Sequence, residues 1–409
     1  MKPVIDTQIV RQNKRQQTVE PEYDVAVVGG GPAGATAASE LAERGHDVLL
    51  IDRDGRIKPC GGAVPPILLR EFSVPETLLE TKVSSARMVA PSETSVDMDI
   101  GGFVGMVDRG VFDPWLRERA VASGATCVTA KFKRIERRHE GGVEVQFETS
   151  DGKTRSVRVR VVVGADGAAS RVREQAFSRQ ERMRHVFAYH EIVRSPEGKT
   201  EDFDPRRCDV YYQGKVSPDF YGWVFPHGKC TSVGAGSAVK GFSLRGAVKI
   251  MRDNSGLADN KIVRREGAPL PLKPLRRWDN GRDVVLIGDA AGAVAPSSGE
   301  GIYYAMSSGR FAAEAVGEYL ATGNARALRQ ARRRFMQAHR LVFVILGIMQ
   351  YYWYSSDKRR EKFVEICRDP DVQRLTWDAY MNKKLVRAKP VAHVRIFFKD
   401  LAHLVGLKN

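Results

Sequence analysis

The sequence lacks every paired cysteine or histidine pattern that holds a metal ion or builds a disulfide framework. Its five cysteines, Cys60, Cys127, Cys208, Cys230 and Cys367, are scattered, and none forms a CxxC or CxxH pair. An odd number of isolated cysteines is typical of a protein from a reducing compartment. The eight histidines form no HxH or HExxH pattern, so we expect no metal site.

Long apolar runs are also missing. The longest strongly apolar segment, 341–353, has 13 residues, whereas a membrane-spanning helix needs roughly 20. Residues 1–22 are polar and carry no secretory signal, and we expect them to form a flexible arm. These absences predict a cytoplasmic protein.

Positive charge is present in excess and is unevenly distributed. The net charge is +16, and residues 324–409 alone contain 19 Lys or Arg against 7 Asp or Glu. Such a tail suits nucleic acid, an anionic membrane surface or a solvated helical face. The apolar segment within the tail favours the membrane, so we expect peripheral membrane contact and no nucleic-acid partner.

The strongest motif lies at 23–54, where a strand, a glycine-rich turn, a helix and a second strand follow one another. Gly29, Gly31 and Gly34 have the spacing G-x-G-x-x-G. The first glycine permits a tight turn, the second lets the backbone approach a pyrophosphate, and the third lets helix and strand pack closely. Asp52 ends the second strand and can accept a hydrogen bond from a ribose hydroxyl. We assign to the same dinucleotide site Pro32, Ala33 and Arg53.

Two later strands end in a glycine and an aspartate. One reads RVVVGADG and contains Asp166 and Gly167, and the other reads DVVLIGDAAG and contains Gly288 and Asp289. With the first motif they resemble the FAD-dependent reductases and hydroxylases built like para-hydroxybenzoate hydroxylase. The resemblance implies that FAD is the cofactor and that Asp289 binds its ribityl chain. Asp166 and Gly167 match the middle motif of that group.

The same resemblance implies further residues around the flavin. Gly299, Gly301 and Ile302 lie near the pyrophosphate and the isoalloxazine ring, and Arg109 matches a flavin-side arginine. The sequence contains no second Rossmann motif, so NADPH as the electron donor is implied by the family alone.

These motifs predict a mixed α/β (α+β) fold. We expect a Rossmann-like FAD-binding domain, an inserted antiparallel-sheet substrate domain and a helical C-terminal region. The expected ranges are 1–22 for the arm, 23–183 and 281–322 for the FAD-binding domain, 184–280 for the substrate domain, and 323–409 for the basic, helical region.

The segment SPDFYGWVFPHG, 217–228, alternates aromatic residues along a predicted strand. Tyr221, Trp223 and Phe225 share one face, and Pro226 is expected to end the strand. Three aromatics on one face form either a core layer or the wall of an apolar cavity. The spacing P-x-x-Y-x-W-x-F-P resembles the signature of the geranylgeranyl reductase family, flavoenzymes that saturate isoprenoid double bonds. It therefore favours a substrate-binding wall that includes all four residues.

The loop KPCGGAVPP, with Cys60, Gly61 and Gly62, matches a cysteine followed by glycines in that family. We expect these three residues beside the flavin, where the glycines let the backbone pass close to a ligand. This loop and the segment 351–385 look like the branch that acts in chlorophyll and bacteriochlorophyll synthesis. One departure is the ribose-binding acid, which is Glu in much of the wider superfamily and Asp52 here.

The resemblance implies a reductase that saturates three double bonds of a geranylgeranyl chain to give phytyl. The substrate is a geranylgeranylated pigment, free geranylgeranyl diphosphate or both, and contact with the pigment-esterifying synthase at a photosynthetic membrane is implied. Cys60 and Tyr221 are candidate proton donors, an ordered water is another, and Cys60 as a small wall residue is the alternative. An archaeal-type prenyl-lipid reductase, an FAD aromatic monooxygenase and a non-catalytic prenyl carrier stay open.

Overall fold

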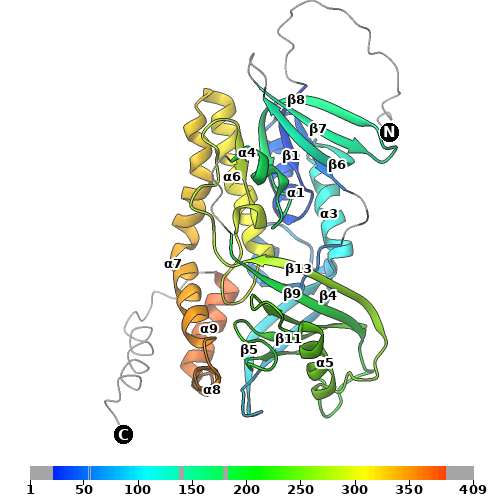
Figure 1. The fold of residues 1–409 in the computed structure, drawn as a ribbon, viewed down its shortest axis with the longest axis vertical. Helices are drawn as coiled ribbons and strands as arrows, with labels where there is room; N and C mark the ends of the chain where they lie inside the picture. The colour runs from blue at the N-terminus through cyan, green and yellow to red at the C-terminus, as the bar shows by residue number, and fades with distance from the viewer. Residues whose placement is uncertain (1–21, 54, 56, 138–141, 178–182, 384–409) are drawn as a thin grey trace, which may run out of the picture.

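Two β-sheets, one above the other, are flanked along one side by long helices (Figure 1). The structure, a computed structural model, describes residues 22–383 apart from 54, 56, 138–141 and 178–182. Residues 1–21 of the expected arm and 384–409 of the basic tail lie outside the described residues.

The first sheet contains a parallel core. Its strands are β1 (Tyr23–Val28), β2 (Val48–Asp52), β6 (Thr126–Arg137), β7 (Val143–Thr149), β8 (Thr154–Gly164) and β14 (Val284–Leu286). β1 lies parallel to β2 and β8, and β14 also lies parallel to β8. The buried valines of β1 and β8 read as continuous apolar runs, as parallel strands covered on both faces require. α1 (Pro32–Glu43) packs against this sheet and contacts both α3 (Arg109–Ala122) and α6 (Ile302–Thr322).

The second sheet has eight strands in the order β13-β9-β12-β11-β10-β4-β5-β3. They are β3 (Ala63–Val64), β4 (Leu79–Val89), β5 (Ser95–Val107), β9 (His185–Arg194), β10 (Arg207–Tyr211), β11 (Gly222–His227), β12 (Cys230–Ser237) and β13 (Ile262–Pro271). Neighbouring strands are antiparallel except β10 and β4, which are parallel. α5 (Leu244–Asn254) packs on β9 and β12.

The mixed α/β fold class is confirmed, but the strands divide between the sheets differently from the expected ranges. Residues 23–183 were expected to form the first part of the FAD-binding domain, yet β3, β4 and β5 belong to the second sheet. The two sheets are therefore each built from separate stretches of chain. The parallel β10–β4 pair joins those stretches across more than a hundred residues, and such a long-range pairing leaves no local pattern in the sequence.

Pro226 does not end its strand, in contrast to the expectation. β11 continues to His227, and Pro226 pairs with Thr231 of β12. The register between β10 and β11 covers only 222–224 of β11. Pro226 therefore lies where its missing N–H is not needed by the β10 side, which is where a sheet tolerates proline.

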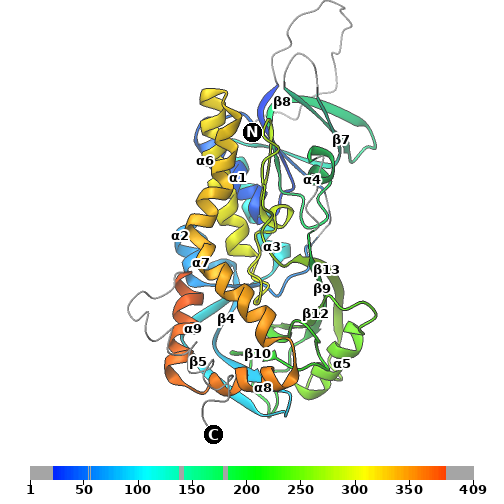
Figure 2. The same cartoon turned by 60° about the vertical axis from the view of Figure 1, so that its left-hand side comes forward.

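The expected helical C-terminal region begins after α6. It comprises α7 (Arg329–Trp353), α8 (Asp357–Ile366) and α9 (Pro370–Asn382). α7 runs along α6, and α8 and α9 lie beside the second sheet (Figure 2). α9 contacts β5 and α2 (Pro66–Glu71). Within the described residues, no helix combines the length and apolarity that crossing a bilayer requires.

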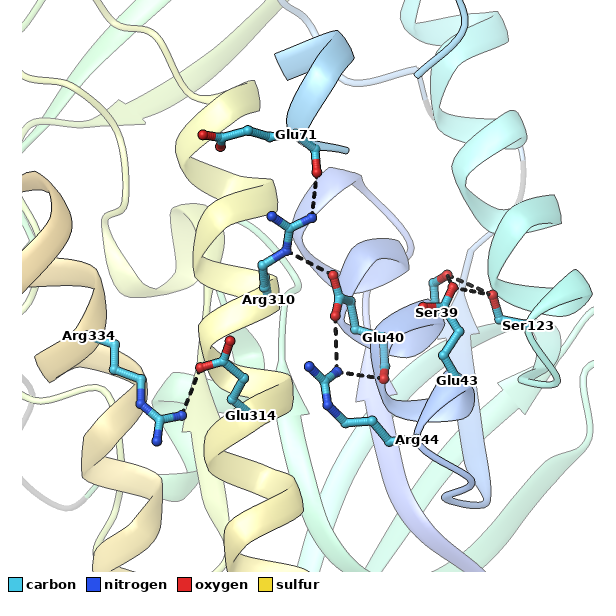
Figure 3. Close-up of polar contacts among 9 residues, drawn as sticks. All are labelled: Ser39, Glu40, Glu43, Arg44, Glu71, Ser123, Arg310, Glu314 and Arg334. Carbon is cyan, nitrogen blue, oxygen red and sulfur yellow. Dashed lines mark hydrogen bonds and ion pairs between the residues drawn. The ribbon is translucent and has the colours of Figure 1, made fainter. Parts of the chain in front are cut away.

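Polar contacts fix α6 to its neighbours on both sides (Figure 3). The Arg310 Nε donates to Glu40 of α1 at 2.9 Å, and its Nη2 donates to the Glu71 carbonyl oxygen at 2.7 Å. On the side facing α7, Arg334 donates to Glu314 at 2.8 Å. These contacts matter for function because the N-terminus of α6 carries the glycine-rich turn 299–301.

α6 and α1 approach closely at Gly309. A Cβ atom there would lie 2.4 Å from the Ala33 carbonyl oxygen and 3.2 Å from the Ala37 nitrogen. Gly317 lies on the same helix, but a Cβ there would meet only His46 Nε2, at 3.5 Å. Position 309 therefore requires glycine for packing, whereas position 317 does not.

We expect Gly309→Ala to destabilise the protein by about 1–3 kcal/mol, because the added methyl group overpacks the α1–α6 contact. Gly317→Ala is the control, and it should hold or raise stability, since alanine favours a helix over glycine by up to about 1 kcal/mol. Thermal unfolding followed by circular dichroism measures both. Equal melting temperatures for the two variants would contradict this account of the helix pair.

Candidate functional site

The turn between β1 and α1 uses its glycines for two different purposes. A Cβ on Gly29 would lie 2.4 Å from the Ala165 carbonyl oxygen, and one on Gly34 would lie 1.8 Å from the Gly29 carbonyl oxygen. Both glycines are therefore required by contacts within the protein. A Cβ on Gly31 would meet only Arg109, at 4.0 Å, so the backbone there faces open space.

That space is a cleft of about 390 Å³ at the carboxyl ends of the parallel strands. Predicted residues that line it are Gly29, Gly31, Asp52, Arg53, Arg109, Asp166, Gly167 and Asp289. Helix α1 begins at Pro32, directly after the cleft residue Gly31, and a helix N-terminus favours an anion. The glycine cradle and this helix end fit a dinucleotide pyrophosphate.

The two acids at the cleft edge differ in how they are engaged. Asp52 accepts a hydrogen bond from Arg117 at 3.3 Å, an arginine that sequence reasoning missed. Burial raises the pKa of Asp52 above its usual value, against the backbone N–H of Gly30 and the Arg117 charge. Asp166 accepts from the backbone nitrogens of Arg171 and Val172, at 2.7 and 3.1 Å, so its carboxylate caps α4 (Arg171–Ala176).

Asp289 lies at the start of the segment that leads to α6. It is buried in η2 (Gly288–Ala291), and it forms an ion pair with Lys58 from the loop before Cys60. The motif identified Asp289, but Lys58 was missed because a single lysine in a loop carries no pattern. Because both residues line the cleft, the ion pair fixes the loop around Cys60 next to it.

Arg109 is held by the carboxylate of Asp113, a residue that the sequence analysis did not identify. Its guanidinium donates twice to Asp113, at 2.6 and 2.7 Å, and both side chains are buried. Burial works against the charged guanidinium, but the Asp113 carboxylate raises the pKa of Arg109 above its usual range. The i,i+4 spacing on a helix is a signal that could have identified Asp113.

A second cavity of about 280 Å³ adjoins the cleft and is mostly apolar. Predicted residues that line it are Pro32, Cys60, Gly61, Gly62, Arg109, Tyr221, Trp223, Phe225, Asp289, Gly299, Gly301 and Ile302. The two cavities share Lys58, Arg109, Ala268 and Asp289. Of the remaining predicted residues, Ala33, Gly34 and Gly288 pack beneath the turn, and Pro226 does not line the cavity.

The three aromatics of β11 and its entry lie on one face, as predicted. The ring centroids of Tyr221 and Trp223 are 6.0 Å apart, and those of Trp223 and Phe225 are 6.3 Å apart. Trp377 and Tyr380 of α9 also line this cavity. Sequence reasoning assigned that helix to a basic tail and missed its part in the cavity, because its partner strands lie far away in sequence.

The loop around Cys60 is fixed by β11. The His227 Nε2–H donates to the Gly61 carbonyl oxygen at 3.0 Å, and burial lowers the pKa of His227 to about 4, so this ring is neutral near pH 7. Gly62 has φ of +72°, and a Cβ there would lie 2.4 Å from His227. A Cβ on Gly61 would lie 3.3 Å from Phe225. Packing against β11 is one reason for the glycine pair, and approach of this backbone to a ligand stays a prediction. The Cys60 Sγ accepts from the Gly62 N–H at 3.3 Å.

Tyr221 links the aromatic wall to the turn before α6. Its hydroxyl donates to the Ser298 carbonyl oxygen at 2.5 Å. Burial raises the pKa of Tyr221 above its usual value. The hydroxyl proton is therefore engaged with the backbone, and the position of the ring is fixed relative to the turn.

Comparison with protein families places two matches along the chain. Residues 22–229 match the FAD binding domain family, and residues 230–391 match the lycopene cyclase protein family. The first match covers just over half of the chain and ends at the hairpin between β11 and β12.

Three groups of relatives share most of the chain. The geranylgeranyl diphosphate reductase of Rhodobacter capsulatus is 52% identical over 94% of this chain and 98% of its own length. The chloroplastic geranylgeranyl diphosphate reductase of Oryza sativa is 38% identical over 93% and 86%. Digeranylgeranylglycerophospholipid reductase 1 of Methanopyrus kandleri is 31% identical over 73% and 81%.

Solved structures share the fold. A geranylgeranyl bacteriochlorophyll reductase-like protein from Thermoplasma acidophilum has a TM-score of 0.77 at 23% identity and covers 90% of this chain and 98% of its own. A flavin-dependent brominase has a TM-score of 0.73 at 18% identity, with 92% and 99% covered. At such identities the likeness shows the fold alone.

We expect Gly31→Ala to leave the apoprotein folded and to weaken FAD binding by about tenfold or more, because the methyl group fills the space of the pyrophosphate. Titration by quenching of flavin fluorescence measures the affinity, and thermal unfolding of the apoprotein checks the fold. Gly317→Ala is the control. An FAD affinity equal to that of the wild type would contradict the assignment of Gly31 to the dinucleotide site.

Proposed function

The chain belongs to the geranylgeranyl reductase family, and from this premise we propose that it is an FAD-dependent reductase that converts a geranylgeranyl chain to phytyl by saturating three double bonds. The observation that carries the proposal is the apolar, aromatic-walled cavity that adjoins the dinucleotide cleft and shares four lining residues with it. A cavity of this kind suits a flexible hydrocarbon chain.

The chemistry divides between cofactor and protein. Bound FAD, when reduced, supplies a hydride, and an isolated trisubstituted alkene also needs a proton. The aromatic wall holds the alkene and excludes water from the cavity. A wall of apolar surface, with few polar groups to fix one register, allows the chain to shift between successive reductions. Cys60 lines the same cavity, and its part in proton delivery stays a prediction.

We infer from the family that NADPH is the electron donor and that the prenyl chain is carried by a pigment, a diphosphate or both. The archaeal prenyl-lipid reductases share less of this chain, which favours the phytyl-forming branch. The monooxygenase alternative rests on structures that share only the fold. The prenyl-carrier alternative predicts a protein without flavin, and it is disfavoured by the match to the FAD binding domain family.

The test is an anaerobic assay of the holoenzyme, with its flavin reduced chemically, against geranylgeranyl diphosphate and against geranylgeranylated bacteriochlorophyll. We expect products heavier by two, four and six hydrogens by mass spectrometry, and none with oxidised flavin. Oxygen consumption with a hydroxylated product would contradict the proposal. In a phototrophic host, pigment that remains fully phytylated after gene deletion would also overturn it.

We also propose that the basic region 323–409 contacts an anionic membrane peripherally, on the cytoplasmic side. The supporting feature is the outer face of α7, hereafter the α7 face, where a groove of about 900 Å³ is rich in arginine. Its arginines are Arg276, Arg277, Arg329, Arg332, Arg333 and Arg340. Contact with the pigment-esterifying synthase at that membrane is inferred from the family.

An apolar stripe continues the α7 face toward the C-terminal end of the helix. Exposed Leu341, Val344, Ile348 and Tyr351 follow one another at spacings of three, four and three residues, so they lie in one line. Arginines beside an exposed apolar stripe complement lipid phosphates and the acyl boundary beneath them. This combination favours an anionic lipid surface over nucleic acid.

We expect Arg333→Glu combined with Arg340→Glu to lower binding to phosphatidylglycerol vesicles by about tenfold or more, because each charge near the surface contributes about 1 kcal/mol. Co-sedimentation with vesicles measures the binding, and neutral phosphatidylcholine vesicles give the background. The matched control is Lys240→Glu with Lys249→Glu, which changes the net charge equally on the α5 side. Equal losses in the two double variants would show a charge effect without a defined face.

A further inference from the structure

One carboxylate lines the apolar cavity but not the dinucleotide cleft. Glu300 belongs to the turn 299–301 that precedes α6, and it lines the same cavity as Cys60 and Trp223. Its side chain is only 7% exposed. Sequence reasoning assigned the glycines on either side of Glu300 and passed over the acid between them.

Lys383, at the C-terminal end of α9, forms an ion pair with the Glu300 Oε2. The lysine side chain is 3% exposed, and its Nζ lies 3.8 Å from the Tyr380 ring centroid. The Tyr303 and Tyr304 rings are each 5.8 Å away. Three aromatic rings and one carboxylate therefore surround a buried ammonium group.

The second carboxylate oxygen has a different environment. Within the described residues, Glu300 Oε1 is buried and has no hydrogen-bond partner. A buried polar atom without a partner is costly, and native proteins retain few of them. Because Glu300 lines the cavity, this unpaired oxygen belongs to a side chain that a group bound inside the cavity would contact.

Burial affects both members of the pair. It raises the pKa of Glu300, against the Lys383 charge, and it lowers the pKa of Lys383, against the Glu300 charge. Both effects favour moving the proton from the ammonium to the carboxyl group. Among the titratable neighbours, burial raises the pKa of Tyr221, Tyr304 and Tyr380, while burial and then Lys383 lower the pKa of His339 to about 4. These neighbours therefore stay neutral near pH 7, and the Glu300–Lys383 pair holds an exchangeable proton.

We propose that Glu300 is the proton donor for alkene reduction in this cavity and that Lys383 is its positioning residue. The Glu300 O–H bond breaks and a C–H bond forms at one alkene carbon, while the other carbon takes the hydride that reduced FAD supplies. The π bond is lost, and Glu300 is left as a carboxylate beside the neutral Lys383 amine until the pair takes a proton from solvent. This proposal rests on the proposed reductase function.

The first test is a single-turnover measurement with chemically reduced holoenzyme and geranylgeranyl diphosphate under anaerobic conditions. We expect Glu300→Gln to slow reoxidation of the flavin by substrate by about 10²- to 10⁴-fold, the usual contribution of a general acid. Its affinity for FAD should remain within about twofold of wild type. Reoxidation within about threefold of wild type would overturn the proposal.

A double variant that neutralises both Glu300 and Lys383 distinguishes a role in proton transfer from a role in stability. Removing both charges by Glu300→Gln with Lys383→Met leaves no uncompensated ion, so its thermal stability should stay close to wild type. We expect this double variant to remain slow, whereas recovery of the rate would reduce the pair to a structural contact. Glu93→Gln with Lys215→Met removes a pair of the same kind at the surface, and it should behave as wild type.

Infrared spectroscopy of the apoprotein tests the proton without flavin. We expect a protonated-carboxyl band in wild type that Glu300→Gln removes. Lys383→Met should strengthen the band, because the cation that lowers the pKa of Glu300 is lost, and Lys383→Arg should restore it toward wild type. A spectrum without this band at the working pH would overturn the proposal. If wild type fails to turn over any prenyl substrate, the reductase function and this proposal both fall, whereas normal turnover with an unaffected Glu300→Gln variant removes only the latter.

Discussion

The site depends on how closely three backbone segments approach the first turn of α1. Gly34 packs on the Gly29 carbonyl oxygen, a Cβ on Gly288 would lie 2.8 Å from the Ala33 Cβ, and Gly309 packs on the Ala33 carbonyl oxygen. No larger side chain fits at these contacts without displacing backbone or a neighbouring methyl group. They set η2 and α6 directly against the turn, and Asp289 of η2 lines the same cleft as the open backbone at Gly31.

Two tyrosine hydroxyls donate to carbonyl oxygens just before the turn 299–301. Tyr221 donates to Ser298, and Tyr354, which follows α7, donates to Ser297 at 2.8 Å. The aromatic wall and the turn before α6 are therefore fixed relative to each other, although they come from different sheets. The Tyr221 hydroxyl is used in a hydrogen bond to the backbone, so the aromatic wall offers mainly apolar ring surface to the cavity. Such a surface suits a hydrocarbon chain that must shift between reductions.

Local motifs in the sequence were sufficient where a steric requirement lies within a few residues. The G-x-G-x-x-G spacing, Asp289 and the shared face of the β11 aromatics all follow from periods of two to six residues. Asp113 was also within reach, because it lies one helical turn from Arg109. The predictions failed or were silent where contacts span long distances in sequence. Lys58 and Asp289 are 231 residues apart, Glu300 and Lys383 are 83 apart, and β4 joins β10 across a comparable gap.

The C-terminal helices show why composition alone was incomplete. Their excess of positive charge and the apolar segment 341–353 suggest an external role, and the α7 face agrees with that reading. The inner side of the same region has another use, because Trp377 and Tyr380 line the cavity and Lys383 neutralises Glu300. A prenyl chain is apolar along its length and attached to a polar or pigmented head, so its enzyme needs both a surface that meets lipid and a cavity that excludes water. Under the proposed function, one run of helices serves both needs, with the α7 face for the lipid and the inner side of α9 for part of the cavity.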